Sequence, residues 1–268
     1  MREDLEAARV LAVRAGAILL ENYARPKVEW KGRDNPVTDA DRSANAYLVQ
    51  ELKRLFPGDA VLSEEEANDT QRLSRRRVWM VDPLDGTVEF VRHLDEFAVL
   101  IGLSVDGTAN LGIVYQPLTQ KLYYAQSGSG AFLAENRSTR LLQVSRESNP
   151  AAMTIALSRS HHSPIVDAVQ RRLGIQQTIT SGSIGLKVGL ICEGRAHLYL
   201  HTSPHTSQWD TCALDIILSE AGGSMTNLFN APLQYNVPAV RNLRGVIATN
   251  GRVHDAVVRA VKSVEDAR

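Results

Sequence analysis

Residues Trp79-Met80-Val81-Asp82-Pro83-Leu84-Asp85-Gly86-Thr87 combine an apolar strand with two closely spaced carboxylates. The apolar run at 78–81 predicts a buried strand that stops at Asp82-Pro83, and Asp85-Gly86 predicts a turn. Pro83 stiffens the link between the two acids because its ring restricts the backbone. Acids this close repel each other unless a cation sits between them, and hard oxygen ligands suit Mg²⁺. The alternative is an ordinary strand that ends in an Asp-Gly turn.

Composition places few limits on the fold and several on the partners. The chain has 268 residues, enough for one large domain or two modest ones. Apolar residues make up 44% and charged residues 22%, which is typical of a globular protein. Lys and Arg number 30, as do Asp and Glu, so the formal net charge is zero. We therefore expect no nucleic acid and no membrane among its partners, and any anionic ligand must be held by a local site.

The two cysteines and the N-terminal residues bear on the compartment. Cys192 and Cys212 both lie in helix-like apolar patterns, which argues against a disulfide scaffold and against a zinc site. The charged N-terminus has no signal-peptide core, and no window of about 18 apolar residues predicts a membrane span. These features predict a cytoplasmic protein.

The first half of the chain, residues 1–145, reads as helices packed on a largely antiparallel sheet. Apolar spacing predicts a first helix to about Tyr23, and Thr38 with Asp41 forms a capping-box pattern ahead of a second. Strands are expected at 28–31, 60–62, 78–81, 97–105, 109–115 and 121–125, and residues 32–36 are expected to form a loop. This half is expected to be an α+β unit.

The second half, residues 146–268, alternates strands with helices. Strands are expected at 154–157, 177–180, 196–200 and 244–248, and helices at 164–173, 184–192, 210–221 and 253–264. Such alternation is typical of an α/β layer with a partly parallel sheet. Asp210 is expected to be the N-cap of its helix.

Acidic residues gather at the ends of the expected elements: Asp41 at a helix start, Glu64-Glu65 after a strand, Asp82 and Asp85 after another, and Asp210 at a second helix start. Each has an ordinary structural interpretation, as a cap or as a solvated loop. Together, in a chain without a zinc pattern, they favour a site for several Mg²⁺ ions and a phosphate.

These acids stand within two longer motifs that resemble the inositol monophosphatase superfamily. The motifs are Asp82-Pro83-Leu84-Asp85-Gly86-Thr87 with Glu64-Glu65 before it, and Trp209-Asp210 with Glu220-Ala221-Gly222-Gly223 after it. Their order and spacing match, and the resemblance extends from the first helix to the last. It implies the sugar-phosphatase fold of that superfamily, which is an α/β (α+β layered) architecture.

The resemblance also implies a ligand set and a mechanism. Glu64, Asp82 and the carbonyl of Leu84 would hold one Mg²⁺, while Asp82, Asp85 and Asp210 would hold a second. Thr87 and Asp41 would orient and deprotonate the attacking water. Glu65 would act as a weaker catalytic group or would hold a third, loosely bound ion. The backbone amides of Gly86 and Thr87 would bind the phosphate.

Within the superfamily the chain is most similar to the 3′(2′),5′-bisphosphate nucleotidases. Ser63 stands where inositol phosphatases usually have Gly, and Glu89 stands where they usually have Asn. His161, Ser183 and Lys187 are the candidates for substrate binding, and a solvated helix face is the alternative for Lys187. Two departures from the nucleotidases are Val88, where Lys is frequent, and His201, in a region where an Arg contacts the nucleotide.

The expected activity is Mg²⁺-dependent conversion of adenosine 3′,5′-bisphosphate to AMP and phosphate. An inositol or sugar phosphatase with the same metal chemistry is the first alternative, favoured by Val88 and His201. An inactive nucleotide- or Mg²⁺-binding module is the second, although every expected ligand is present. The resemblance further suggests a small phosphorylated substrate, inhibition by Li⁺ and a possible homodimer.

Overall fold

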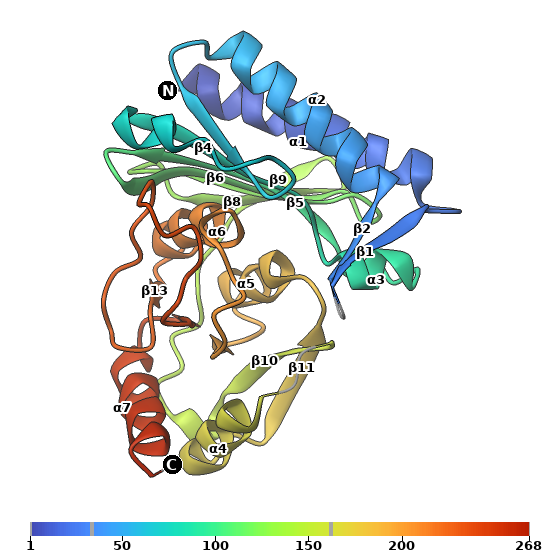
Figure 1. The fold of residues 1–268 in the computed structure, drawn as a ribbon. Coiled ribbons are helices and arrows are strands. Elements are labelled where there is room, and N and C mark those ends of the chain that lie inside the picture. The colour runs from blue at the N-terminus through green and yellow to red at the C-terminus, as the bar shows by residue number, and fades with distance from the viewer. Residues whose placement is uncertain (1, 33–34, 161–162, 268) are drawn as a thin grey trace.

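The computed structural model describes residues 2–32, 35–160 and 163–267. The elements form layers (Figure 1): α1 and α2 cover one face of a seven-stranded sheet, and α5 and α6 lie between that sheet and a five-stranded sheet. Helices α4 and α7 cover the outer face of the smaller sheet. This arrangement confirms the predicted α/β layered fold.

The helices follow the apolar spacing of the sequence closely. Their bounds are α1 Arg2–Asn22, α2 Asp39–Leu55, α3 Thr87–Val91, α4 Pro164–Leu173, α5 Ile184–Cys192, α6 Gln208–Glu220 and α7 His254–Glu265, with 3-10 helices η1 Thr70–Ser74 and η2 Pro150–Ala152. Thr38 caps α2, and Asp41 completes the predicted capping box. In the described part of the chain, no helix is long and apolar enough to cross a membrane.

The larger sheet has the strand order β3-β4-β5-β6-β7-β8-β9. Its strands are β3 Ala60–Ser63, β4 Arg77–Asp85, β5 Ala98–Val105, β6 Thr108–Gln116, β7 Lys121–Gln126, β8 Ala131–Glu135 and β9 Ser138–Leu141. Strands β3 and β4 are parallel, and the remaining pairs are antiparallel as predicted. The parallel pair brings the ends of β3 and β4, with their acids, to the same edge.

The smaller sheet has the order β11-β10-β12-β14-β13, and β1 pairs with β2 in a separate hairpin. The bounds are β10 Thr154–Ser158, β11 Gln177–Ser181, β12 Leu198–His201, β13 Ser224–Thr226, β14 Val246–Thr249, β1 Val28–Gly32 and β2 Asn35–Thr38. Strand β10 is parallel to β11 and β12, whereas β14 is antiparallel to both of its neighbours. The predicted partly parallel sheet is therefore confirmed.

Strand β4 differs from the prediction in a way that shapes the site. It does not stop at Asp82, because Asp82 pairs with Leu100 and Asp85 pairs with Ala98 on β5. The register shifts between these two pairs, which identifies a bulge across Pro83-Leu84. Pro83 lacks a backbone donor, so a bulge is a position where the sheet tolerates it. Both acids therefore belong to the strand and are held by its pairing.

The core between the two sheets contains residues from both halves of the chain. Met80 and Leu100 of the larger sheet belong to one cluster with Cys212 of α6 and Ala248 of the smaller sheet. A second cluster joins α1 and α2 to the opposite face of the larger sheet, and a third joins α4 and α7 to the smaller one. Both Cys192 and Cys212 are buried free cysteines.

Helix α6 lies directly against the backbone of the larger sheet, because two paired glycines leave room for it. Gly102 and Gly112 face each other on β5 and β6. A Cβ atom on Gly112 would lie 2.2 Å from the carbonyl oxygen of Ala213, and one on Gly102 would lie 2.8 Å from the Ala213 nitrogen. These glycines therefore set the height of α6, and of Asp210 in its first turn, above the sheet.

Candidate active site

Asp82 lies at the centre of the predicted site and is 3% exposed. Its Oδ1 accepts a hydrogen bond from the backbone amide of Leu84 at 3.0 Å, across the bulge. Gly86 ends the segment in the left-handed conformation, with φ of 97°. A Cβ atom there would lie 2.7 Å from the carbonyl oxygen of Glu96, so both the conformation and the space favour glycine. The chain then enters α3 at Thr87.

The carboxylate of Asp85 is bound by the first turn of α5. It accepts hydrogen bonds from the Ser183 hydroxyl, from the amide of Ile184 at 3.1 Å and from the amide of Gly185 at 2.7 Å. Unpaired amides at a helix start attract anions. Burial raises the pKa of Asp85, and these hydrogen bonds together with the charge of Lys187 oppose that rise. Asp85 thus joins the larger sheet to the second half of the chain.

Asp210 is held by the start of α6, but not in the predicted position. The N-cap is Ser207, and Asp210 is the N3 residue of a capping box with it. Its Oδ2 accepts from the Ser207 amide at 2.7 Å. The N-cap prediction was wrong because Ser207, three residues earlier, supplies the capping side chain. Burial, followed by the charge of Glu64, raises the pKa of Asp210 well above its usual range.

Glu64, Asp82, Asp85 and Asp210 form an electrostatically connected group. The Glu64 amide donates to the carbonyl of Val81 at 3.1 Å, which holds the end of β3 beside β4. The pKa of Asp82 is raised well above its usual range, first by burial and then by the charges of Glu64, Asp210 and Asp85. Four acids from three separate segments therefore oppose one another's ionisation, as expected where a cation belongs.

The chemistry of this donor set fits a hard divalent cation, since all four side chains offer carboxylate oxygens and none offers nitrogen or sulfur. The backbone carbonyl of Leu84, also predicted as a ligand, accepts from the Thr87 hydroxyl at 3.1 Å. Among the described residues, no three His, Cys, Asp or Glu side chains already stand in metal-holding geometry. The ligand assignments therefore remain predictions.

Asp41 and Thr87, the predicted water-activating pair, are brought together. The Thr87 hydroxyl lies 3.3 Å from Oδ1 of Asp41. The other oxygen, Oδ2, accepts from the amide of Thr38 at 2.8 Å and from its hydroxyl at 2.5 Å. Burial raises the pKa of Asp41 to about 6, and the charge of Glu65 contributes to that rise. The capping residue of α2 therefore orients a carboxylate whose second oxygen faces Thr87.

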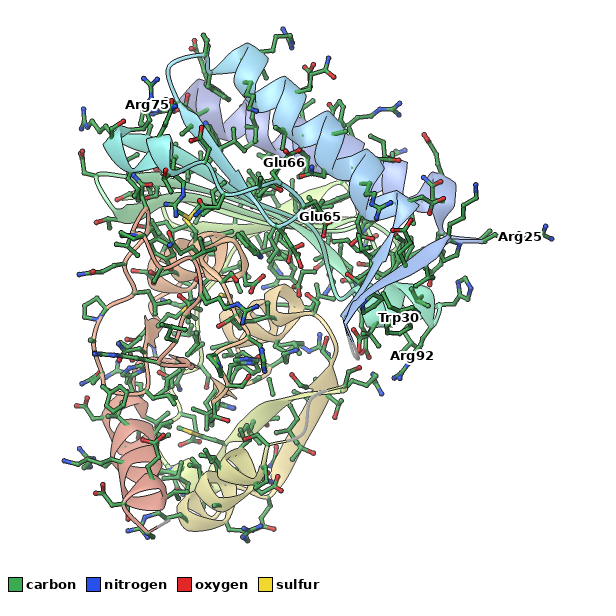
Figure 2. The ribbon with its side chains drawn as sticks, viewed as in Figure 1. Arg25, Trp30, Glu65, Glu66, Arg75 and Arg92 are labelled. Carbon is green, nitrogen blue, oxygen red and sulfur yellow. The ribbon has the colours of Figure 1, made fainter. Side chains whose placement is uncertain are left out.

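Glu65 lies on the turn that carries Glu64, and this turn is clamped by a residue that sequence reasoning missed. Asn45 of α2 accepts from the Ser63 hydroxyl at 2.6 Å and donates to Oε1 of Glu66 at 2.9 Å. In Figure 2 Glu65 and Glu66 lie where the connection after β3 passes below α2. Asn45 is one helical turn beyond Asp41, so the two residues share a face of α2. This spacing is the sequence signal that could have placed Asn45 near the site.

The predicted substrate residues are placed differently from one another. Ser183 is fully buried, and its hydroxyl donates to Asp85 while accepting from the Leu186 amide at 3.0 Å. Lys187 is 1% exposed, so the alternative of a solvated face was wrong. Its ammonium donates to the carbonyls of Ser181 and Gly182 at 3.1 and 2.5 Å. His161 lies outside the described residues. Substrate binding by these residues stays a prediction.

Two further positions bear on specificity. His201 ends β12, and its ring nitrogens lie 3.2 Å from the Tyr199 hydroxyl and 2.9 Å from the Ser203 hydroxyl. Glu89 is 3% exposed. The sequence marks Glu89 only as a difference from the inositol phosphatases and assigns it no role. Its Oε1 accepts from the Ser160 hydroxyl at 2.5 Å. This contact spans 71 residues, so no local pattern signals it.

Comparisons with known proteins identify the family of this chain. The sequence model that describes the inositol monophosphatase family matches residues 1–266 of this chain. The 3′(2′),5′-bisphosphate nucleotidase CysQ of Salmonella typhimurium is 38% identical over 235 residues, which are 86% of this chain and 93% of that protein. The histidinol-phosphatase of Mycobacterium tuberculosis is 33% identical over 263 residues, 96% of each chain.

A solved structure extends the similarity to the fold. CysQ from Bacteroides thetaiotaomicron, described as a bacterial member of the inositol monophosphatase family, superposes with a TM-score of 0.81 at 30% identity. The match covers 94% of this chain and 98% of that one. The layered architecture is thus that of the inositol monophosphatase family.

Proposed function

Given that this chain belongs to the inositol monophosphatase family, we propose that it removes the 3′-phosphate from adenosine 3′,5′-bisphosphate, giving AMP and phosphate, with Mg²⁺ as cofactor. Members of the family are metal-dependent phosphatases, so the chain is a phosphoric monoester hydrolase. The choice of substrate is supported by several nucleotidase relatives at 32–38% identity. The predicted family and the predicted enzyme class are confirmed.

The observation that carries the proposal is the group of mutually interacting acids Glu64, Asp82, Asp85 and Asp210. These carboxylates, with the Leu84 carbonyl, would hold Mg²⁺, which prefers oxygen ligands. A bound ion would stabilise negative charge on the phosphoryl oxygens and favour ionisation of a coordinated water. Phosphate monoesters hydrolyse very slowly without a catalyst, so charge stabilisation of this kind is needed.

The chain's own residues would position the reactants. The hydroxyl of Thr87 would orient the attacking water, and Asp41, 3.3 Å away, would receive the proton that Thr87 passes on. The amides of Gly86 and Thr87, next to the left-handed turn, would bind the phosphate. Hydrogen bonds from α5 and from the α6 cap keep Asp85 and Asp210 in place. Glu65, which acts electrostatically on Asp41, would support this pair.

A phosphate-release panel tests the proposal. We expect the purified protein with Mg²⁺ to hydrolyse adenosine 3′,5′-bisphosphate with a higher kcat/KM than inositol 1-phosphate or histidinol phosphate. Chelation should abolish the release, and Asp85→Asn should reduce it by at least about a hundredfold. Turnover of inositol 1-phosphate with none of the bisphosphate would refute the substrate. Full activity of Asp85→Asn would refute the site.

Two other substrates are separated by the same panel. The histidinol-phosphatase relative covers 96% of each chain, more than the nucleotidase from Salmonella typhimurium does, so hydrolysis of histidinol phosphate is the second candidate. Val88 and His201, the departures from the nucleotidases, favour an inositol or sugar phosphate modestly. The homodimer and the division at residue 145 stay predictions.

A further inference from the structure

Glu89 is a buried acid to which the proposed reaction assigns no role. It lies on α3 two residues beyond Thr87, and the residue is 3% exposed. A buried carboxylate is costly unless hydrogen bonds and a nearby cation compensate for its lost hydration. What surrounds Glu89 therefore indicates what holds it there.

Its contacts reach two segments of the second half. Oε1 accepts a 2.5 Å hydrogen bond from the hydroxyl of Ser160, in the connection between β10 and α4. The side chain also lies flat on Gly182, in the turn between β11 and α5. A Cβ atom on Gly182 would stand 2.2 Å from both Cγ and Cδ of Glu89. One acid of the first half thus holds both segments, and Gly182 permits the approach.

Lys187 is a cation whose charge acts on Glu89, and Arg159 is another. Its buried ammonium is bound to the carbonyls of Ser181 and Gly182, on the same turn that Glu89 contacts. Burial lowers the pKa of Lys187 to about 8, and the charges of Asp85, Glu89 and Glu96 oppose that fall. The buried lysine therefore has a role in making the buried acid tolerable, next to the carboxylate of Asp85.

A second acid, Glu96, contacts the same two segments of the second half and is less buried than Glu89. Glu96 forms an ion pair with Arg159, and its Oε2 accepts from the Gly182 amide at 2.8 Å. Arg159 binds both carboxylate oxygens of Glu96, but its side chain is 38% exposed, so water and salt screen this pair in part. The hydrogen bond from Ser160 to Glu89 is more sheltered, and breaking it would leave a buried group unsatisfied. Glu89 is therefore the more deeply buried of the two acids that contact these segments.

We propose that Glu89 is a specificity-determining positioning residue, which fixes Arg159-Ser160 and the Gly182 turn of the second half against the catalytic motif of the first. This inference rests on the proposed function. The motif that ends at Thr87 would hold the phosphate being cleaved, and the rest of a nucleotide extends beyond it. A large substrate needs the second-half segments in place, whereas a small phosphate ester does not.

Replacing Glu89 with Asn tests this, because Asn is one methylene shorter and cannot keep both contacts. We expect Glu89→Asn to raise KM for adenosine 3′,5′-bisphosphate about tenfold, as for loss of one buried hydrogen bond to a charged group. The kcat value and the Mg²⁺ concentration for half-maximal activity should change less than about threefold, as should KM for p-nitrophenyl phosphate. Glu89→Gln, which keeps the acceptor for Ser160, should restore most of the affinity.

Glu96→Gln is the matched control, since it removes the charge of the less buried acid and should change KM less than about threefold. Ser160→Ala breaks the Glu89 hydrogen bond from its other end and should raise the bisphosphate KM as Glu89→Asn does. An unchanged KM in Ser160→Ala, or a Glu89→Asn effect on kcat and Mg²⁺ dependence alone, would overturn the proposal. The alanine variant decides the matter if Glu89→Asn does not fold.

Hydrogen–deuterium exchange separates this inference from the proposed function, because it needs no substrate. Peptides containing Arg159 and Ser160 should exchange faster in Glu89→Asn than in the unmodified protein, and peptides from β5 should not. Faster exchange in a protein that hydrolyses none of the panel would reject the proposed function but support the positioning role of Glu89. Equal exchange in both proteins would reject the positioning role itself.

Discussion

At the scale of single residues, the pair Asp41 and Thr87 shows how a helix cap becomes part of a site. Thr38 directs both of its donors to one oxygen of Asp41, so the other oxygen is left facing Thr87. The acid of the capping box and the proposed proton acceptor are therefore the same carboxylate, that of Asp41. The hydrogen bonds that stabilise the start of α2 also orient Asp41, so no further residue is needed to position it.

Replacing Thr87 with Val tests the pair directly, because Val has nearly the same shape but no hydroxyl. We expect Thr87→Val to lower kcat by about a hundredfold or more, the usual contribution of positioned proton transfer. Thr87→Ser keeps the hydroxyl and should retain most of the activity. Steady-state kinetics at saturating Mg²⁺ provide the measurement, and equal kcat values for the Ser and Val variants would contradict the assignment.

The pH dependence of kcat/KM follows from the environment of Asp41. Burial raises its pKa to about 6, so Asp41 is protonated below that pH and then cannot accept a proton from Thr87. Activity should therefore fall as pH falls through about 6 and should be restored as pH rises again. A pH–rate profile at saturating Mg²⁺ measures this, and Asp41→Asn should show low activity without that acid limb. An acid limb retained in Asp41→Asn would assign it to another group.

Residue patterns predict roles where the determining contacts are local. Thr38 and Asp41 lie three positions apart, so the capping box was recognisable, and the Asp210 error came from a Ser three positions upstream. Lys187 was less predictable, because the carbonyls that bind its ammonium come from a turn whose shape the sequence does not specify. Its burial therefore became evident only from the structure.

At the scale of elements, α2 acts as a spacer between two parts of the site. Asp41 in its first turn faces Thr87, and Asn45 in the next turn holds the connection after β3 through Ser63 and Glu66. Residues four apart lie on the same helix face. One rigid helix therefore sets where Glu64-Glu65 stands relative to Asp41 and Thr87, the proposed water-activating pair.

Removing the Asn45 clamp should weaken metal binding without touching a predicted ligand. Asn45→Leu leaves the Ser63 hydroxyl without its buried acceptor, at a cost of about 1–3 kcal/mol in unfolding free energy. We also expect weaker binding of Mg²⁺ in a calorimetric titration without substrate, because Glu64 is held less firmly. Gln50→Leu, on the exposed face of the same helix, is the control. Equal Mg²⁺ affinity in both variants would show that the clamp serves folding alone.

Element types were more predictable than element ends. The apolar periods identified the helices and most strands, since burial of one face depends on that period. The three-residue strand β13 Ser224–Thr226 carries too few residues for a period, and β2 Asn35–Thr38 lies where turn-forming residues predicted a loop. Strand β4 continued past Pro83 because a bulge accommodates proline, and a bulge has no sequence period.

At the scale of the whole molecule, the height of α6 above the larger sheet joins folding to function. Asp210 comes from α6 and Asp82 from the sheet, and their separation depends on how closely the helix approaches Gly102 and Gly112. The interior is close-packed, so the helix cannot move locally without disturbing its neighbours. Two glycines outside the proposed site thereby set the spacing of its acids.

Adding a single methyl group should reveal this dependence. In Gly112→Ala the new carbon meets the Ala213 carbonyl oxygen, which is backbone and cannot rotate away. We expect a loss of about 1–3 kcal/mol in unfolding free energy and a lower kcat with weaker Mg²⁺ binding, measured by denaturation and calorimetry. Gly58→Ala is the control, because nothing lies within 4 Å of its Cβ position. Matching behaviour of the two variants would contradict the account.

The whole site was only partly predictable, for a physical reason. The acidic motifs indicate the proposed chemistry because carboxylates at element ends are visible along the chain. Which segments hold those acids is not visible, because Asp85 is bound by residues 98–100 positions away and Glu89 by one 71 positions away. Such contacts arise from packing the two sheets on α5 and α6, and no local pattern encodes them.

The shared core also has a consequence for synthesis on the ribosome. The face of the larger sheet that carries Met80 and Leu100 is covered by α6, which is made about a hundred residues later. A nascent chain that has only its first half outside the exit tunnel therefore exposes an apolar sheet face, a surface that chaperones bind and that aggregates readily. It also lacks Asp210, so the proposed cation site is incomplete. Assembly of the site should be among the last events of biogenesis, after α6 has emerged and docked.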